Sequence, residues 1–325
     1  MSKFNYLNIE EAYENIKHKL IKTPLITNDY INQILNSKVY FKLENLQITG
    51  SFKLRGATNK INKLSKKQKL AGVVAYSSGN HAQAVGYAST QENISAKIIM
   101  PKNAPKIKID NTRKYKAEVI LYDPEKEIRE EIGKKIARNE NRTIIKPYDD
   151  HDIIAGQGTA AYEISKELEN HSIIPDIYLC CCGGGGLIAG TSTYLKYRYP
   201  NIQSFAVEPF GFDDTKQSLD SKKIIANKPG KSSICDALFA QQPGELTFPI
   251  NLEHIKGGFV VSDKEVKNSI KVLAEHLKII VEPGGAVAAT AALTNKINLK
   301  NKNVIVMISG GNIDFDMFVN LWKKI

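Results

Sequence analysis

Short apolar stretches rich in β-branched residues alternate with amphipathic stretches along most of the chain. The apolar stretches have the length of buried strands, and the amphipathic ones repeat apolar residues at helical spacing. The alternation predicts an α/β fold with largely parallel sheets and helices on both faces. The predicted strands are 39–43, 73–76, 96–100, 118–122, 143–146, 177–181, 204–208, 258–261 and 304–308, and the predicted helices are 9–20, 81–91, 125–139, 153–168, 187–198, 264–277 and 286–293.

Several loops that follow the predicted strands are rich in glycine, serine and asparagine. In open α/β sheets, ligands bind beyond the carboxyl ends of the strands, where loops meet helix N-termini. We therefore expect the chemistry in these loops, which are 49–53 (TGSFK), 77–81 (SSGNH), 183–186 (GGGG), 282–285 (EPGG) and 309–312 (SGGN).

Four consecutive glycines, 183–186, separate a predicted strand from a predicted helix. Glycine permits positive φ values and close backbone approach, so successive N–H groups can surround a phosphate at the positive end of the helix dipole. The run lacks the Lys-Ser/Thr pair of a nucleoside triphosphate loop. We expect a phosphate monoester here, and a slack connection between strand and helix is the alternative.

A second glycine string, 156–161 (GQGTAA), matches the pattern of dinucleotide-binding loops and has Asp176 at the spacing expected of the acidic residue. The residues before it, 148–152 (YDDHD), are polar and do not predict a strand. Because the dinucleotide loop requires a strand, a turn and a helix in succession, we do not expect NAD at this string.

The chain is basic, with 45 Lys and Arg against 34 Asp and Glu, a net charge of +11 and a pI near 9.2. Such a balance suits nucleic acid or an anionic ligand. The basic residues are dispersed, however, and the run 66–69 (KKQK) has no aromatic neighbours on which bases would stack. We expect a solvated basic surface and no nucleic-acid partner, with a non-catalytic nucleic-acid-binding protein as the alternative.

The cysteines and the N-terminus bear on the compartment. Cys180, Cys181 and Cys182 are consecutive and Cys235 stands apart. Neighbouring residues on a strand point to opposite faces, so the run suits neither a disulfide framework nor a CxxC metal site. No apolar run has the length of a membrane span, and the N-terminal residues lack the pattern of a signal peptide. We expect a cytoplasmic protein with no membrane partner.

Lys53 lies in a turn that contains glycine and serine and enters a helix. A phosphorylated cofactor with covalent chemistry would need such a lysine. The segment 51–57 (SFKLRGA), together with the loops 77–83, 183–187, 282–286 and 309–312, resembles the pyridoxal-phosphate enzymes of the threonine dehydratase and serine racemase family. The motifs occur in the family's order and span most of the chain.

The resemblance implies a fold and a cofactor. The fold is the type II, tryptophan synthase beta-like architecture, in which two parallel-sheet lobes carry helices on both faces. We expect a large cofactor-binding domain from 1–71 and 148–325, a small domain from 72–147, and pyridoxal 5'-phosphate in the cleft between them. Members of the family also lead us to expect a homodimer.

The resemblance assigns roles to particular residues. Those that match cofactor-binding positions are Lys53 in the Schiff base, Phe52 and Glu282 beside the ring, Asn80 at the phenolic oxygen, Ser309 at the pyridine nitrogen, and Gly183, Gly184, Gly185, Gly186 and Leu187 around the phosphate. The loop that matches the substrate-carboxylate site comprises Ser77, Ser78, Gly79, Asn80 and His81. Its clustered donors suit a carboxylate and equally suit a capped helix start.

An acidic loop after the strand 204–208 is a candidate cation site. Glu208, the carbonyl of Phe212 and Asp214 match the family's spacing of oxygen ligands, which hard cations such as Mg or Ca prefer. A solvated acidic loop is the alternative. Arg129 and Asp236 lie near family positions that face the substrate and the cofactor, but a surface position suits Arg129, and a supporting position suits Asp236 and Glu282, equally well.

The resemblance implies dehydration and deamination of L-threonine or L-serine to a 2-oxo acid and ammonia, with Lys53 taking the proton from Cα. A neutral serine at the pyridine nitrogen makes the ring a weaker electron sink than a carboxylate would, which favours loss of the β-hydroxyl. Serine racemisation is the first alternative, because Ser78 would supply a proton from the opposite face. Dehydration of 3-hydroxyaspartate is a further alternative.

Overall fold

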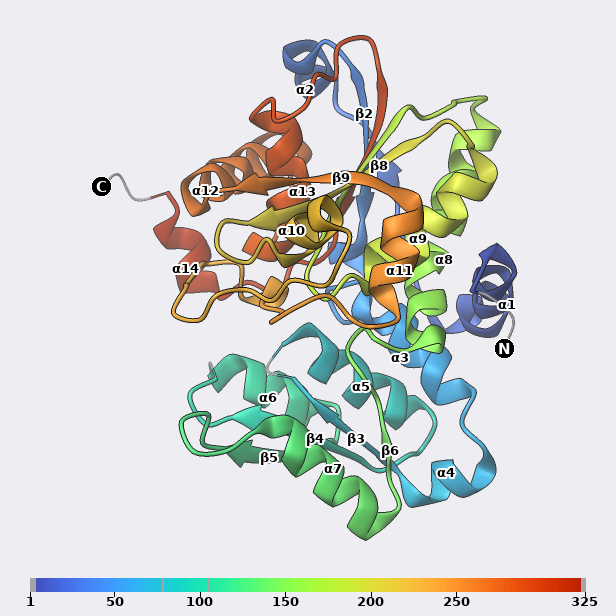
Figure 1. The fold of residues 1–325 in the computed structure, drawn as a ribbon, viewed down its shortest axis with the longest axis vertical. Coiled ribbons are helices and arrows are strands. Elements are labelled where there is room, and N and C mark those ends of the chain that lie inside the picture. The colour runs from blue at the N-terminus through green and yellow to red at the C-terminus, as the bar shows by residue number, and fades with distance from the viewer. Residues whose placement is uncertain (1–3, 78, 105, 323–325) are drawn as a thin grey trace.

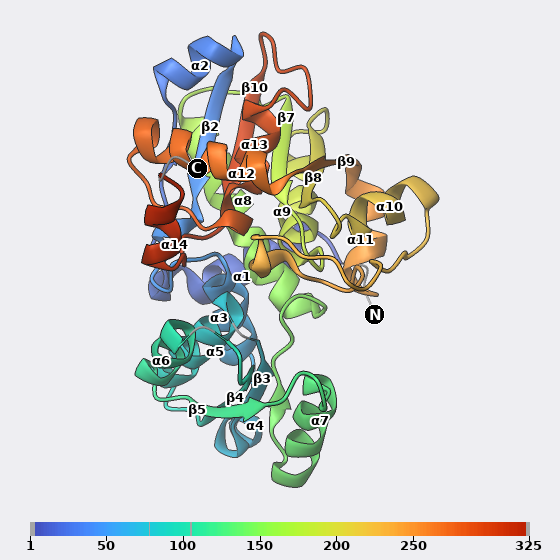
Figure 2. The same cartoon turned by 90° about the vertical axis from the view of Figure 1, so that its left-hand side faces the viewer.

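The computed structural model describes residues 4–77, 79–104 and 106–322. Two lobes with separate sheets make up the molecule (Figure 1). The larger lobe contains both the beginning and the end of the chain, whereas the smaller lobe contains a continuous stretch from its first half. The view turned by 90° shows the same separation and places helix α3 (Lys53–Asn62) between the lobes (Figure 2).

The large lobe contains a six-stranded sheet in the order β1-β2-β10-β7-β8-β9, in which only the edge pair β1 and β2 is antiparallel. Every residue of its strand β7 is buried, as expected for a parallel sheet covered on both faces. The strands are β1 (Leu25–Ile26), β2 (Lys38–Leu43), β7 (Ile177–Cys181), β8 (Gln203–Pro209), β9 (Ile255–Val261) and β10 (Asn303–Ile308).

The helices of the large lobe cover both faces of this sheet (Figure 2). Capping side chains define several of them: Asn5 caps α1, and Ser262 begins a capping box at α12. The helices are α1 (Tyr6–Ile16), α2 (Asp29–Leu35), α8 (His151–Asn170), α9 (Gly186–Arg198), α10 (Asp214–Ser221), α11 (Thr247–His254), α12 (Asp263–Val272), α13 (Pro283–Leu293) and α14 (Phe315–Asn320), with short turns η1 (Lys17–Lys19), η2 (Glu44–Leu46), η3 (Asp236–Leu238) and η4 (Leu273–Leu277).

The small lobe contains a parallel four-stranded sheet in the order β5-β4-β3-β6. Its apolar core combines residues of β3 and β4 with Leu54, Ala57 and Ile61 of α3. Helix α3 therefore packs on the small lobe although it precedes residue 72, and the domain limits at 72 and 147 stay a prediction. The elements are α4 (Lys66–Ala71), β3 (Val73–Tyr76), α5 (Asn80–Gln91), β4 (Ala96–Pro101), α6 (Lys106–Lys114), β5 (Glu118–Tyr122), α7 (Arg129–Glu140) and β6 (Thr143–Ile144).

The prediction of an α/β fold with two parallel-sheet lobes is confirmed, and three predicted strands, β3, β5 and β7, have the predicted limits. The two-residue strand β1 was not predicted, because it is too short to show a period. The predicted helix 264–277 consists of α12 followed by a π-helical turn, η4. No helix among the described residues is long and apolar enough to cross a membrane.

The glycine string 156–161 lies inside helix α8, not between a strand and a helix. A Cβ at Gly156 would lie 2.6 Å from Cα of Gly56 on α3, and a Cβ at Gly190 of α9 would lie 2.2 Å from the carbonyl oxygen of Ile154. These distances are too short for a side chain. The glycines therefore serve close packing of α8 against α3 and α9.

Candidate active site

A cavity lies between the two lobes and brings together residues from the predicted loops. The small-lobe side includes Asn80 and Arg129, and the large-lobe side includes the glycine run, Glu282 and Ser309. Lys53, at the first position of α3, also lines the cavity. Residues far apart in the sequence thus meet at the carboxyl ends of both sheets, as expected for parallel α/β folds.

Helices α5, α9 and α13 are among those that begin at the cavity without a side-chain cap. Their N-cap residues are Gly79, Gly185 and Glu282. Several other helices are capped by side chains, as α4 is by Ser65 and α8 by Asp150. The first N–H groups of a helix have no partner within the helix and carry its positive dipole end. The uncapped ends therefore make the cavity suitable for anionic groups.

The glycine run fits a narrow space between Tyr148 and α11. A Cβ at Gly184 would lie 2.4 Å from the ring of Tyr148, and a Cβ at Gly186 would lie 3.0 Å from Cβ of the same residue. Gly185 has φ +89°, and the hydroxyl of Thr247 donates to the carbonyl of Gly184 at 2.7 Å. Residues with side chains at these positions would collide with Tyr148. Because the glycines have none, the backbone N–H groups of the run stay accessible to a phosphate.

Lys53 has little to neutralise its charge. Its Nζ donates to the carbonyl oxygen of Pro147 at 2.7 Å and lies 5.2 Å from the ring centroid of Phe52. Burial lowers the pKa of Lys53 to about 8, although Cys181 and Glu282 partly oppose this shift. A larger fraction of the amine is therefore neutral near pH 8 than in an exposed lysine, as a nucleophile or base requires.

Asn80 and Glu282 meet across the cleft. Asn80 Nδ2 donates to Glu282 Oε1 at 2.5 Å, and both residues are buried. Burial raises the pKa of Glu282 to about 7. Ser309 is also buried at the cavity, and its carbonyl accepts a hydrogen bond from the N–H of Phe52 at 3.1 Å. The loop after β10 is thereby tied to the segment that carries Lys53.

The proposed carboxylate loop is only partly described. Ser78 lies outside the described residues. Ser77 Oγ accepts from the N–H of Gly79 at 3.2 Å. His81 Nε2 lies 2.9 Å from the carbonyl oxygen of Ile145, so Nε2 carries the proton, and burial lowers the pKa of His81 to about 3. The imidazole N–H of His81 is thus engaged within the small lobe.

Two further groups at the cavity come from the small lobe. Arg129, the first residue of α7, lies over the ring of Tyr76 at 5.7 Å and donates to Glu130 at 2.8 Å. Lys108 of α6 forms an ion pair with Asp236 of η3, which links the two lobes. Lys108 and Tyr148 carried no signal in the sequence, because neither belongs to a motif or a periodic pattern.

The candidate cation residues Glu208 and Asp214 are buried near one another. Glu208 accepts hydrogen bonds from the N–H groups of Thr215 and Lys216 at 2.9 and 2.7 Å. Asp214 Oδ1 accepts from Asn227, and Asp214 Oδ2 is buried without a partner. Burial raises the pKa of Asp214 to about 7. The described residues contain no cluster of three or more His, Cys, Asp or Glu suited to a metal, so a cation here stays a prediction.

Comparison with known proteins identifies relatives along nearly the whole chain. The family model for pyridoxal-phosphate dependent enzymes matches residues 16–310. Serine racemase of Schizosaccharomyces pombe is 39% identical over 98% of this chain and 97% of the relative. L-threo-3-hydroxyaspartate ammonia-lyase of Saccharomyces cerevisiae is 38% identical over 97% and 95%. The crystal structure of threonine deaminase from T.th. has a TM-score of 0.90 at 34% identity, covering 96% of this chain and 99% of that chain.

Proposed function

Since this chain belongs to the pyridoxal-phosphate dependent enzymes, we propose that it dehydrates and deaminates L-serine or L-threonine to a 2-oxo acid and ammonia. Its structural neighbours have fold type II. The observation that carries the proposal is Lys53, a partly buried amine beside an uncapped glycine-rich helix end, with a neutral serine, Ser309, in the same cavity. A small amino acid is the substrate class that this cavity would accept.

The residues present fit pyridoxal 5'-phosphate. The N–H groups of 183–187 would hold its phosphate, because the loop leaves no room for side chains and α9 has no cap. Asn80 and Ser309 supply neutral hydrogen-bonding groups for the ring, and Lys53 supplies the amine for covalent attachment. When bound, the cofactor supplies an electron sink for negative charge at the substrate Cα.

Lys53 is the proposed base. Its lowered pKa increases the fraction of neutral amine, which is the form that can take the Cα proton. The carbonyl of Pro147 accepts an N–H of the amine and restrains its position. The uncapped N-terminus of α5 would bind the substrate carboxylate through backbone N–H groups, since helix ends favour negative charge.

Racemisation of serine is the second candidate. It is favoured by the serine racemases of Schizosaccharomyces pombe and Dictyostelium discoideum, which are 39% and 40% identical to this chain. The proposed second acid and base, Ser78, lies outside the described residues. Dehydration of 3-hydroxyaspartate is the third candidate, supported by the relative from Saccharomyces cerevisiae.

One assay separates these activities. The protein loaded with pyridoxal phosphate is given L-serine, L-threonine or 3-hydroxyaspartate, and both 2-oxo acid and D-amino acid are quantified. We expect pyruvate from L-serine to exceed D-serine. Ser78→Ala should abolish D-serine formation and leave measurable dehydration of L-threonine. If D-serine forms faster than pyruvate in the wild type, racemisation becomes the main activity.

A further inference from the structure

Three polar side chains form a continuous chain of hydrogen bonds, and two of them, Asn80 and Glu282, line the cavity. Asn312 Nδ2 donates both to the carbonyl oxygen of Thr49, at 2.8 Å, and to Asn80 Oδ1, at 2.7 Å. Asn80 Nδ2 in turn donates to Glu282 Oε1 at 2.5 Å. Asn80 belongs to the small lobe, whereas its two partners belong to the large lobe, so the chain of bonds crosses the cleft.

The hydrogen bonds determine which way each carboxamide faces. A backbone carbonyl only accepts, so the carbonyl of Thr49 requires the amide nitrogen of Asn312 on its side. That nitrogen uses its second hydrogen for Asn80, which must then present Oδ1. Asn80 therefore turns its nitrogen to Glu282. Among the contacts of the described residues, Asn80 Nδ2 has this single acceptor, which leaves it one N–H to donate.

Glycines allow the loops to approach closely enough for these bonds. Gly50 has φ +70°, and a Cβ there would lie 2.3 Å from Asn312 Oδ1. A Cβ at Gly310 would lie 2.0 Å from Glu282 Oε1. Backbone bonds join the same loops, from the N–H of Gly311 to the carbonyl of Gly50 at 2.9 Å and from the N–H of Glu282 to the carbonyl of Gly310 at 3.1 Å. Side chains at these glycines would push Asn312 and Glu282 away from Asn80.

We infer that Asn312 is a positioning residue, which together with Glu282 fixes the carboxamide of Asn80 so that its remaining N–H serves the bound cofactor. The inference rests on the proposed function, because it assigns Asn80 to pyridoxal phosphate. Without Asn312, only the hydrogen bond to Glu282 holds the carboxamide of Asn80, and a turn of the carboxamide would place its oxygen toward the cofactor in place of the donor. Loss of the N–H that Asn80 donates would remove about one hydrogen bond to the cofactor. This corresponds to a decrease in cofactor affinity of about fivefold to tenfold.

The test compares Asn312→Ala with a matched control, Asn45→Ala. Asn45 Nδ2 donates to the carbonyl of Ile280 at 3.1 Å, so it also ties one of these loops to a backbone carbonyl but reaches Ile280 instead of Asn80. The dissociation constant for pyridoxal phosphate, the visible absorption band of the bound cofactor and the melting temperature without cofactor are measured for each protein. Asn312→Asp serves as a second variant, because aspartate keeps the size but cannot donate.

We expect Asn312→Ala and Asn312→Asp to weaken cofactor binding about fivefold to tenfold and to shift the absorption band, with Asn45→Ala within about twofold of wild type. In a double-mutant cycle, adding Asn312→Ala to Asn80→Ala should cause no further loss, since Asn312 acts through Asn80. Equal effects of the Asn312 and Asn45 variants, or additive losses in the cycle, would overturn the inference. A wild-type protein that binds no pyridoxal phosphate would instead overturn the proposed function on which it rests.

Discussion

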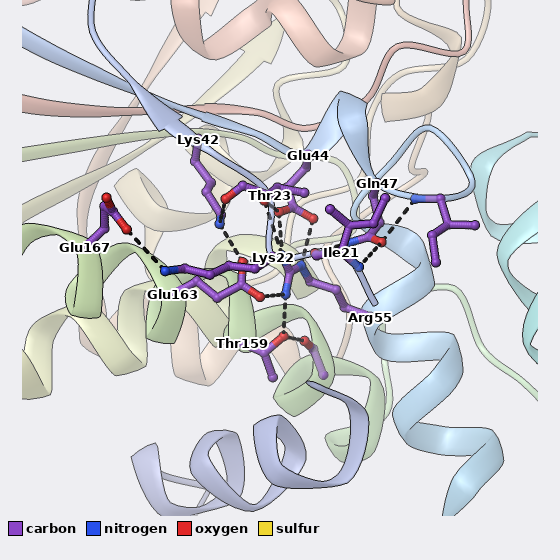
Figure 3. Close-up of polar contacts among 12 residues, drawn as sticks. Ile21, Lys22, Thr23, Lys42, Glu44, Gln47, Arg55, Thr159, Glu163 and Glu167 are labelled. Atoms are coloured by element: carbon purple, nitrogen blue, oxygen red, sulfur yellow. Dashed lines mark hydrogen bonds and ion pairs between the residues drawn. The ribbon is translucent and has the colours of Figure 1, made fainter. Parts of the chain in front are cut away.

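Two cations only two positions apart on helix α3, Arg55 and Lys53, lie in opposite electrostatic surroundings. Arg55 is fully buried and makes paired hydrogen bonds to both Glu44 and Glu163, at 2.7 to 2.9 Å (Figure 3). Lys42 donates to Glu163 at 2.6 Å, so two cations and two anions balance within this cluster. We call Lys42, Glu44, Arg55 and Glu163 the buried ion cluster.

Lys53, by contrast, donates to a neutral carbonyl at 2.7 Å. The pKa of Lys53 falls to about 8 because burial disfavours its charge, whereas the carboxylates of the buried ion cluster raise the pKa of Arg55 and keep it charged. Helix α3 also joins the lobes, with Leu54 and Ala57 in the core of the small lobe and Arg55 bonded to the large lobe. The neutralised charge of Arg55 thus anchors α3. The amine of Lys53, which has no carboxylate partner, is available for chemistry.

The largest effect should come from removing the amine. Lys53→Met is expected to lower 2-oxo acid formation at least about a thousandfold, because the side chain supplies both the covalent attachment and the base. Stability should be unchanged or higher, since a buried charge with no carboxylate partner is lost. Residual activity within tenfold of wild type, or borohydride labelling of another lysine in the wild type, would contradict this assignment.

Arg55→Met should, in contrast to Lys53→Met, cause a large loss of stability. Removal of one member of a buried ionic group leaves uncompensated charge and costs about 3–5 kcal/mol. Urea denaturation of Arg55→Met and Lys53→Met, as a matched pair on one helix, measures the difference in the free energy of unfolding. Addition of Glu44→Gln to Arg55→Met should recover part of the loss. Equal stabilities of the two single variants would show that the buried ion cluster does not anchor α3.

The pH dependence of cofactor attachment sharpens the same comparison. Only the neutral amine attacks the cofactor, so the attachment rate should rise about tenfold per pH unit below pH 7 and level off above the pKa of Lys53 of about 8. The growth of the visible band after mixing protein without cofactor and pyridoxal phosphate measures this rate. A rate that still rises tenfold between pH 9 and pH 10 would indicate an ordinary lysine.

The smallest effect concerns Glu208 and Asp214, two buried carboxyl groups without a cationic partner in the buried ion cluster. A cation bound there at about five times its Kd should raise the free energy of unfolding by about 1 kcal/mol. Thermal unfolding with chelator, Mg²⁺ or Ca²⁺ measures the effect. Asp214→Asn should abolish the response and Asp213→Asn should retain it. Identical melting temperatures of the wild type in all three solutions would argue against a cation site.

Local sequence patterns determined much of the architecture. The alternation of buried strands and amphipathic helices predicted largely parallel sheets covered by helices, and the family resemblance implied two lobes. Strand β7 and the start of α9 followed from an apolar run that ends in four glycines. Lys53 was identifiable because its segment and the other loop motifs occur in a characteristic order. The strands and helices depend on neighbouring residues, so a local pattern is sufficient to predict them, whereas Lys53 was identified through the family resemblance.

Other features depended on the packing of distant segments. Asn312 and Asn80 are 232 positions apart, and Arg55 and Glu163 are 108 apart. The string 156–161 has the letters of a dinucleotide loop, but in the structure it packs α8 against α3 and α9. Only the tertiary structure decided which charges are neutralised and which are left for chemistry, because burial and hydrogen-bond partners arise when the lobes assemble and no local pattern encodes them.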